Sequence, residues 1–275
     1  MVTKYTKDEN KGLLWNIIIG VISIINIIVI FYYFVTNRFN MNIRQLNLTF
    51  LIIIYVLVCA VRSIWPRVDG KYLCCYDNLI STPLVGRILA TMAEISFGLF
   101  IVMVSNDVIR SLNLENEDWL ILINSGLVFV ITIAQIFCWV GIVTSDPNYN
   151  AIEESLWTVF GISKFIMYTY IFAKISKTNN INANKIKKII PIILISTLAY
   201  ITFMVVRDVP MYIENAKNHV GGYNSLPVGL KKLSKCIEVT HSYKKWKDDI
   251  PWLTGYFTLT VWTSMFILIW HNKNL

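Results

Sequence analysis

Charged residues are scarce in this chain, and their scarcity indicates the class of protein. Only 15% of the 275 residues are Asp, Glu, Lys or Arg, whereas 55% are hydrophobic and the mean hydropathy is +0.55. A soluble domain carries about 25% charged residues. The deficit is explained if much of the surface faces lipid, and no stretch has the composition of a second globular domain.

Histidine is rarer still, since the sequence contains only three. His271 lies near the last residue and His219 lies in a predicted loop, which excludes the His-rich metal clusters of membrane desaturases and hydroxylases. The P-loop, GxSxG and HExxH patterns are absent. We therefore expect neither a metal site nor a cofactor, and the sequence leaves open whether the protein is an enzyme.

Long apolar runs, by contrast, are abundant. A membrane-spanning helix needs about 20 mostly apolar residues, and the sequence offers seven candidates: 13–35, 48–65, 88–104, 119–143, 156–175, 189–206 and 252–270. The first is longer than the apolar region of a signal peptide, about 7–15 residues, so we interpret it as a retained span. The sequence predicts an all-α, polytopic integral membrane protein. Residues 1–275 would form a single seven-helix membrane domain, with 207–251 as a long extramembrane loop.

The predicted last span, 252–270, contains no Lys that could form a retinal Schiff base. We therefore expect no retinal-binding residue, although seven spans invite the comparison with microbial rhodopsins. The third and seventh spans also lack the DRY-like and NPxxY-like signatures of G-protein-coupled receptors.

Seven spans place the two termini on opposite sides of the membrane. We call the N-terminal side, with loops 66–87, 144–155 and 207–251, side A, and the opposite side B. The distribution of Lys and Arg does not settle which side is cytoplasmic. An oxidising side A would allow Cys236 to pair with Cys74 or Cys75, whereas the sequon at Asn47 lies on side B. Within the long loop, the pattern over 228–246 predicts an interfacial amphipathic helix.

Polar residues follow one face of several predicted spans. Arg87, Thr91 and Glu94 are separated by steps of four and three, which places them on one helical stripe. A carboxylate inside a bilayer costs about 2.5–3.5 kcal/mol, so it normally faces a bundle interior or a watery cavity. Two further residues, Lys164 and Tyr168, share a stripe of the fifth span.

We therefore predict an intramembrane polar site containing Glu94, Lys164, Thr91, Gln135 and Tyr168. The estimated depths of Glu94 and Lys164 allow a buried ion pair between them. For the hydroxyl and amide groups, the competing interpretation is hydrogen bonding that only holds helices together.

Side A also carries charged residues at predicted span ends. We predict a mouth there formed by Arg62, Arg87, Arg207 and Asp208. Arginines in such positions suit an anionic ligand or a lipid phosphate. The competing interpretations are solvated loop charges and arginines that reach from the apolar region to the interface.

The leading functional hypothesis is transport, or conduction by an ion channel, of a proton, an ion or a small polar solute through a polar bundle interior. One alternative is a membrane-embedded enzyme acting on a lipid or amphiphile, with Glu94 or Asp208 as acid or base. Another is a non-enzymatic sensor or assembly protein. The expected partner is the lipid bilayer rather than nucleic acid, because Lys and Arg flank apolar spans. Neither the membrane nor the oligomeric state is indicated.

Overall fold

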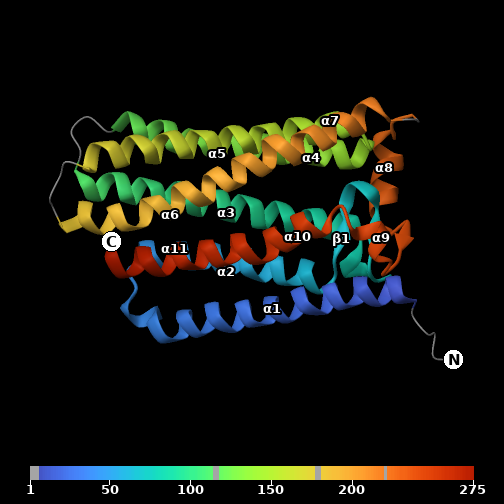
Figure 1. Cartoon of the computed structure of the whole chain (residues 1–275), viewed down its shortest axis with the longest axis horizontal. Helices are drawn as coiled ribbons and strands as arrows, with labels where there is room; N and C mark the ends of the chain where they lie inside the picture. Colours follow the sequence, from blue (N-terminus) through green and yellow to red (C-terminus); the bar gives the residue numbers. More distant parts are fainter. Residues whose placement is uncertain (1–5, 114–117, 177–180, 220–221) are drawn as a thin grey trace. The chain divides into compact units, whose positions relative to one another are not determined.

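Helices dominate the computed structural model, which describes residues 6–113, 118–176, 181–219 and 222–275 (Figure 1). The structure is 85% helical, and the described residues include seven helices long and apolar enough to span a membrane. The prediction of an all-α, multi-pass integral membrane protein is confirmed. Five of the spanning helices are α1 Lys7–Asn37, α2 Ile43–Ile64, α3 Pro83–Leu112, α4 Asp118–Thr144 and α5 Pro147–Ile175. The sixth span begins with α6 Ile181–Phe203 and continues to Lys217, and the seventh is the last helical run, Ile250–Asn274.

Two of these spanning runs contain π-helical segments. After α6, the segment η4 Met204–Asp208 is π-helical and leads directly into α7 Val209–Lys217. The last run consists of α10 Ile250–Gly255, the π-helical segment η5 Tyr256–Thr260 and α11 Val261–Asn274. Helix therefore continues to Lys217, whereas the sequence places the start of a loop at 207.

The chain divides into two compact units, which we describe separately. Unit 1 comprises 1–97 and 225–270, and unit 2 comprises 98–224 and 271–275. Helices α3 and α11 each continue from unit 1 into unit 2. The organisation as a single membrane domain stays a prediction.

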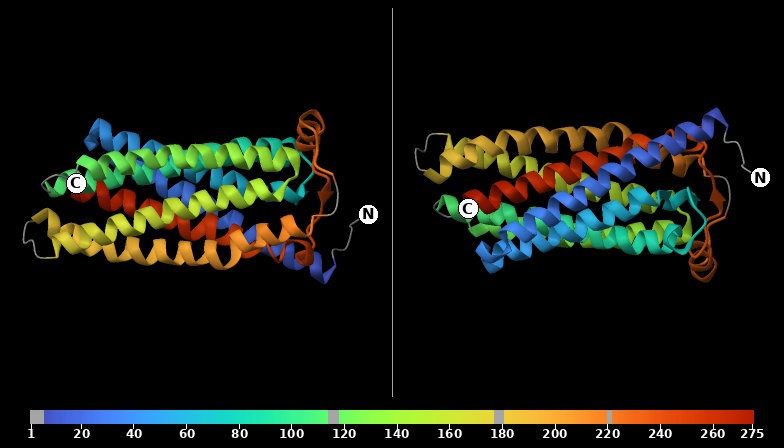
Figure 2. Two further views of the ribbon diagram at one scale, coloured as in Figure 1. Left: turned by 90° about the horizontal axis from the view of Figure 1, so that it is seen from above. Right: turned by 90° about the horizontal axis from the view of Figure 1, so that it is seen from below.

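Unit 1 pairs long helices with a small structured end, which we call the cap and define as residues 65–82 and 225–249. Helix α1 packs against α2, as Figure 2 also shows. In the cap, the strands β1 Arg67–Val68, β2 Leu73–Cys74 and β3 Glu238–Val239 form one sheet in the order β1-β2-β3. Strands β1 and β2 are antiparallel, and β2 and β3 are parallel.

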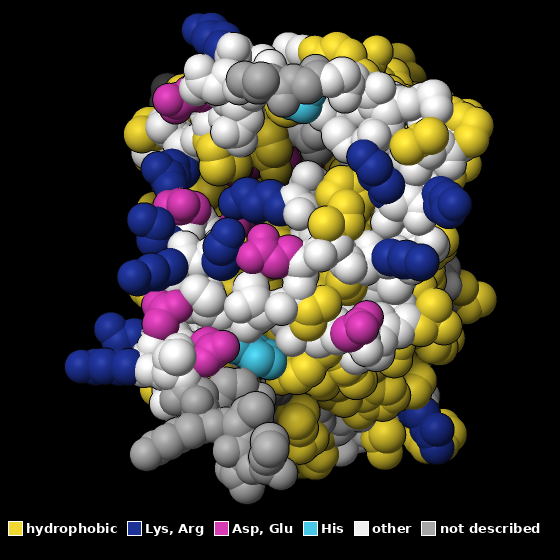
Figure 3. Space-filling view, turned by 90° about the vertical axis from the view of Figure 1, so that its right-hand side faces the viewer, with side chains coloured by type: hydrophobic (Ala, Val, Ile, Leu, Met, Phe, Trp, Pro, Cys, Tyr) yellow, Lys and Arg dark blue, Asp and Glu magenta, His cyan; other side chains and the backbone are white. Residues whose placement is uncertain are grey.

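The second part of the cap differs from the single amphipathic helix predicted over 228–246. It contains α8 Leu226–Leu233, strand β3 and the short α9 Tyr243–Trp246. The chain leaves the helix after Leu233 because the following residues join the sheet, where Leu73 pairs with Glu238. Figure 3 views the cap end and shows Lys and Arg side chains interspersed with Asp and Glu.

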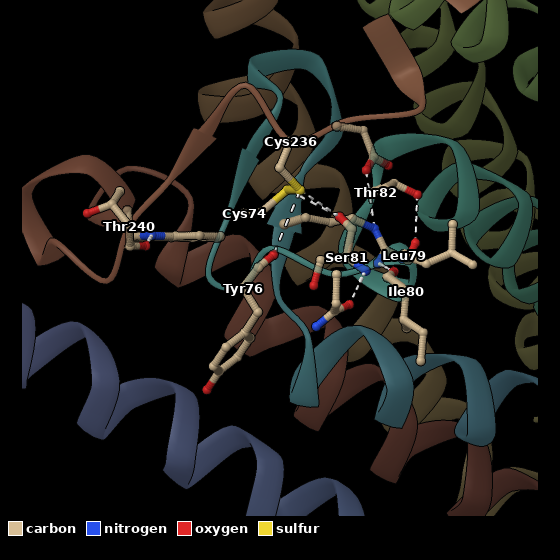
Figure 4. The surroundings of a disulfide bond; sticks show 12 residues. Cys74, Tyr76, Leu79, Ile80, Ser81, Thr82, Cys236 and Thr240 are labelled. Atoms are coloured by element: carbon tan, nitrogen blue, oxygen red, sulfur yellow. Dashed lines mark hydrogen bonds and ion pairs between the residues drawn. A yellow bond between two sulfur atoms is a disulfide. The ribbon is translucent and has the colours of Figure 1, made fainter. Parts of the chain in front are cut away.

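The cap is tied to the start of α1 and is cross-linked internally. The Ser242 hydroxyl donates to Asp8 Oδ2 at 2.5 Å, and a Cβ added to Gly12 would lie 2.0 Å from the His241 carbonyl oxygen. A disulfide joins Cys74 of β2 to Cys236 (Figure 4). Of the two pairings that the sequence allowed, the structure therefore has the one with Cys74.

Unit 2 is built around α4, α5 and α6. Helix α4 packs against α5, and α5 packs against α6 and α7 (Figure 2). The core between them is apolar and includes Val102, Leu127, Ile131, Ala134, Trp157, Phe160 and Met204. Other large apolar side chains of these helices are exposed, for example Leu122 and Ile195. An exposed apolar helix surface of this kind suits contact with lipid.

Candidate functional site

Unit 1 contains a cluster of charged and aromatic side chains where α2, α3 and η5 meet the cap. We call it the cap-end cluster. It comprises Arg62, Arg67, Asp69, Arg87, Glu94 and Tyr256, which are linked by ion pairs, ring contacts and electrostatic interactions. The cluster joins the last turn of α2 to α3 through β1 and the 3-10 helix η2 Asp69–Lys71 that follows it.

One part of the cluster is an ion pair within α3. Arg87 Nη2 donates to Glu94 Oε1 at 3.0 Å, and Arg87 Nε lies 3.4 Å from Thr91 Oγ1. The two charged side chains are 6% and 14% exposed. Because residues at steps of four and three share a helical face, one local stretch of sequence builds the whole pair. The predicted stripe of Arg87, Thr91 and Glu94 is therefore present.

Arg67 is the most deeply buried charge of the cluster. Its side chain has no exposed surface, its Nη1 donates to the Ile80 carbonyl at 2.7 Å, and its Nε lies 3.4 Å from Asp69 Oδ1. A Cβ added to Gly86 would lie 1.6 Å from Arg67 Nε, so the side chain needs a glycine on α3. Burial lowers the pKa of Arg67 to about 10, while Asp69 opposes this shift. The guanidinium is still charged at neutral pH.

Arg62 completes the basic side of the cluster. Its Nη2 lies 4.0 Å from Asp69 Oδ2, and its guanidinium carbon lies 5.8 Å from the ring centroids of both Tyr256 and Phe257. This aromatic contact holds the cation at the edge of the π-helical segment η5. The residue therefore bridges α2, the cap and the last helical run of unit 1.

Several buried polar atoms of the cap-end cluster have no hydrogen-bond partner among the described residues. They are Arg62 Nε, Arg67 Nε and Nη2, Asp69 Oδ1 and the Tyr256 hydroxyl. Buried polar groups normally find partners, and each one left without a partner costs about 1–3 kcal/mol. Arg67 Nε and Asp69 Oδ1 still form an ion pair with each other at 3.4 Å. The other three atoms are donors, and donors without hydrogen-bond partners in one charged cluster are a feature expected of a ligand site.

Unit 2 contains a separate polar network around Lys164 of α5. The Lys164 ammonium donates to Asn124 Oδ1 and to Ser105 Oγ, the latter at 3.1 Å. Ser105 Oγ in turn lies 2.9 Å from the Tyr168 hydroxyl, and Asn124 Nδ2 donates to Asn106 Oδ1 at 2.7 Å. Lys164 is thus buried among neutral partners in its unit, and Tyr168 joins it as the predicted stripe requires.

A third group of polar side chains lies at the π-helical segment η4 of unit 2. Asp208 is buried, as is Glu153 of α5, and both interact electrostatically with Tyr212, as does Glu154. Single-turn π-helical segments within α-helices often occur at functional sites. Gln135 is also buried, in α4 of the same unit.

The predicted site residues are thus distributed over both units. Arg62, Arg87, Thr91 and Glu94 come together in unit 1, whereas Lys164, Tyr168, Gln135, Arg207 and Asp208 belong to unit 2. The Glu94–Lys164 ion pair, which would join the two units, stays a prediction, and so does a mouth common to Arg62, Arg87, Arg207 and Asp208. Arg67, Asp69 and Tyr256 were not among the predicted site residues. The only sequence signal for the first two is an Arg and an Asp separated by one residue directly after a span, and Tyr256 lies within the predicted last span without such a signal.

Comparison with known proteins gives no further guide. No protein-family model matches the chain, and no curated protein or solved structure matches it either. Among the described residues, no group of three or more His, Cys, Asp or Glu side chains could hold a metal ion. The fold and the buried charges define a multi-pass integral membrane protein with charged groups inside its spanning helices.

Proposed function

We propose that the protein passes a proton, an ion or a small polar solute across a bilayer, and that the cap-end cluster is its binding site. The observation that carries the proposal is the Arg87–Glu94 pair, which lies within a candidate spanning helix. Placing an ionisable side chain inside a membrane costs free energy, and such residues commonly mark the pathway of a substrate, an ion or a proton. Glu94 would be the titratable group of the pathway, and the arginines would attract the solute.

The decisive measurement is flux into sealed liposomes that contain the purified full-length protein. We expect Glu94→Gln to lower flux at least tenfold. The Gln side chain still offers an oxygen to Arg87, so the variant retains a hydrogen bond in place of the ion pair. A proton-sensitive dye and ion-selective dyes would distinguish a proton from other ions.

The matched control is Arg38→Gln. Arg38 is an exposed charged residue directly after the C-terminal end of α1, away from the α1 end that the cap contacts. Its substitution should leave flux within about twofold of the unsubstituted protein. Flux that is unchanged in Glu94→Gln, or lost equally in both variants, would contradict the proposal.

A second candidate function, an enzyme acting on a lipid or amphiphile, is favoured by one feature of unit 2. Asp208 is a buried carboxyl in a π-helical segment, with Glu153 as a second buried carboxyl in its unit. Two nearby carboxyl groups can divide the roles of acid and base. Incubating the protein with mixed lipids and analysing them by mass spectrometry tests this function. Product formation that Asp208→Asn abolishes would favour the enzyme, and unchanged lipids would exclude it for those tested.

A further inference from the structure

The cap-end cluster carries more positive than negative charge. Arg87 is paired with Glu94, whereas Arg62 and Arg67 share the single carboxylate of Asp69, so these last three residues together carry a net charge of +1. The three cations are close enough to affect one another, since Arg62 and Arg87 both act on Arg67. A single negative charge in the cluster would balance it.

The buried donors that lack hydrogen-bond partners are the candidates to bind that negative charge. Arg62 Nε, Arg67 Nη2 and the Tyr256 hydroxyl are buried donors from three different elements, and none has a hydrogen-bond partner among the described residues. Tyr256 interacts electrostatically with both Arg62 and Arg87. Guanidinium groups present planar sets of N–H donors that match the oxygens of phosphate and carboxylate groups.

Asp69 restricts the chemistry of the ligand further. Its Oδ1 is buried 3.4 Å from Arg67 Nε, and it also lacks a hydrogen-bond partner among the described residues. A carboxylate oxygen can only accept, so it repels a fully deprotonated anion and favours one that carries an O–H group. The cluster therefore suits an anion that has acceptor oxygens for the arginines and one donor for Asp69.

Contacts within the cap and with α3 fix the position of Arg67. Arg67 is fixed by the Ile80 carbonyl and by its contact with Gly86, and the Cys74–Cys236 disulfide links the strand next to β1 to the second part of the cap. In Figure 4, Ile80 and the disulfide lie in the same part of the cap. A site formed in advance binds with less loss of conformational freedom.

We propose that Arg62, Arg67, Asp69 and Tyr256 form a binding site for a protonated phosphate group, either free dihydrogen phosphate or a phosphomonoester headgroup. This inference rests on the proposed function, in which the cap-end cluster is the binding site, and it adds the chemical class of the solute that binds there. Arg62 and Arg67 bind the phosphate oxygens, Tyr256 donates to another, and the phosphate O–H donates to Asp69. Sulfate has the same shape but is a dianion without an O–H group, so it binds more weakly.

Binding is measured by calorimetry on the purified full-length protein in a neutral detergent free of phosphate. We expect inorganic phosphate to bind saturably and at least tenfold more tightly than sulfate. Arg62→Lys keeps the charge but loses the planar donors, so it should weaken phosphate binding at least tenfold. Asp69→Asn should remove most of the preference over sulfate, and Arg38→Gln should change neither affinity.

The lipid source is tested with the same protein and vesicles of neutral phosphatidylcholine containing either phosphatidic acid or phosphatidylglycerol. Phosphatidic acid is a phosphomonoester with an O–H group, whereas phosphatidylglycerol is a diester. Preference for phosphatidic acid that Arg62→Lys removes would identify a headgroup as the ligand. Saturable binding of inorganic phosphate without a preference for phosphatidic acid would identify free phosphate as the ligand.

Two results would overturn the inference. One is that neither inorganic phosphate nor phosphatidic acid binds to protein that remains folded by circular dichroism. The other is that phosphate and sulfate bind equally to the unsubstituted protein. Phosphate binding without any flux would contradict the proposed transport function but not the site, whereas flux without phosphate binding would contradict the site alone.

Discussion

Removing the Cys74–Cys236 disulfide provides a sharp test of the cap. The bond closes a loop between residues 162 positions apart in the sequence. In the chain-entropy description, a cross-link over such a loop removes about 17 cal/mol/K from the unfolded chain, or about 5 kcal/mol at 25 °C. This figure is a ceiling, because helices that stay inserted in the membrane already restrict the unfolded chain. Since stability changes of 1 kcal/mol shift Tm by about 2–4 °C in chains of this size, Cys236→Ser should lower Tm by up to about 10–20 °C.

Cys75→Ser is the matched control, because Cys75 is adjacent to Cys74 in the sequence, is buried and forms no disulfide. Its backbone N–H donates to the Pro66 carbonyl, an interaction that the substitution leaves in place. Thermal unfolding of both variants, followed by circular dichroism in detergent, compares them directly. Reduction should lower the Tm of the unsubstituted protein and leave that of Cys236→Ser unchanged.

Chemical labelling provides an independent check of the pairing. Burial raises the pKa of the Cys75 thiol to about 12, so this thiol should react slowly with maleimide in the folded protein. Peptide mapping under non-reducing conditions should recover Cys74 linked to Cys236. A Cys75–Cys236 peptide, or an equal loss of Tm in the two variants, would refute the reasoning.

Two further perturbations test the surroundings of the cap. Gly86→Ala places a Cβ 1.6 Å from Arg67 Nε and should destabilise unit 1 by about 1–3 kcal/mol. In the control variant Gly20→Ala, the Cβ would meet Ile64 at an ordinary 3.9 Å, so the substitution should cost less than about 1 kcal/mol. Equal Tm values in the two variants would contradict the position of Arg67. Burial lowers the pKa of His241 below its ordinary 6.5, so the unfolded chain binds the extra proton more readily and stability should be lost as the pH falls through about 6.5. The free energy of unfolding, measured between pH 5 and 8, should fall with decreasing pH in the unsubstituted protein and fall less steeply in His241→Asn. The same pH dependence in both proteins would exclude His241 as its cause.

The spans could be predicted from the sequence because their signal is local and long. Each has enough consecutive apolar residues to cross a bilayer, and this length selects the helix whatever the tertiary structure. The stripe of Arg87, Thr91 and Glu94 could be predicted for the same reason, since steps of four and three within one helix fix which side chains share a face. The Arg87–Glu94 ion pair itself was not predicted, because Lys164 was the expected partner of Glu94. The helix ends were predicted less well, because polar residues also extend helices beyond the apolar region. Helix α3 begins at Pro83 rather than at residue 88, and the helix that includes α6 continues beyond residue 206 through η4.

The cap could not be predicted, because its strands have only two residues each and therefore show no periodicity. Neighbouring strand residues point to opposite faces, so the choice between Cys74 and Cys75 depends on the register of the sheet. That register pairs Cys74 with Val239, close to Cys236. Arg67 is buried for a similar reason: its position depends on β1 lying against Gly86 of α3, a contact between elements that no local pattern encodes.

The two buried cations illustrate where sequence reasoning ends. For Arg87, the nearest acid on the same helical stripe is its partner, so charge and geometry agree. For Lys164, the sequence offers Glu94 as a candidate acid, whereas the unit that contains Lys164 supplies Asn124 and Ser105 as neutral acceptors. An amide oxygen accepts from an ammonium without a second desolvated charge, which avoids part of the cost of a buried ion pair. Amide and hydroxyl groups on neighbouring helices are therefore candidate partners for a buried lysine, alongside a buried acid.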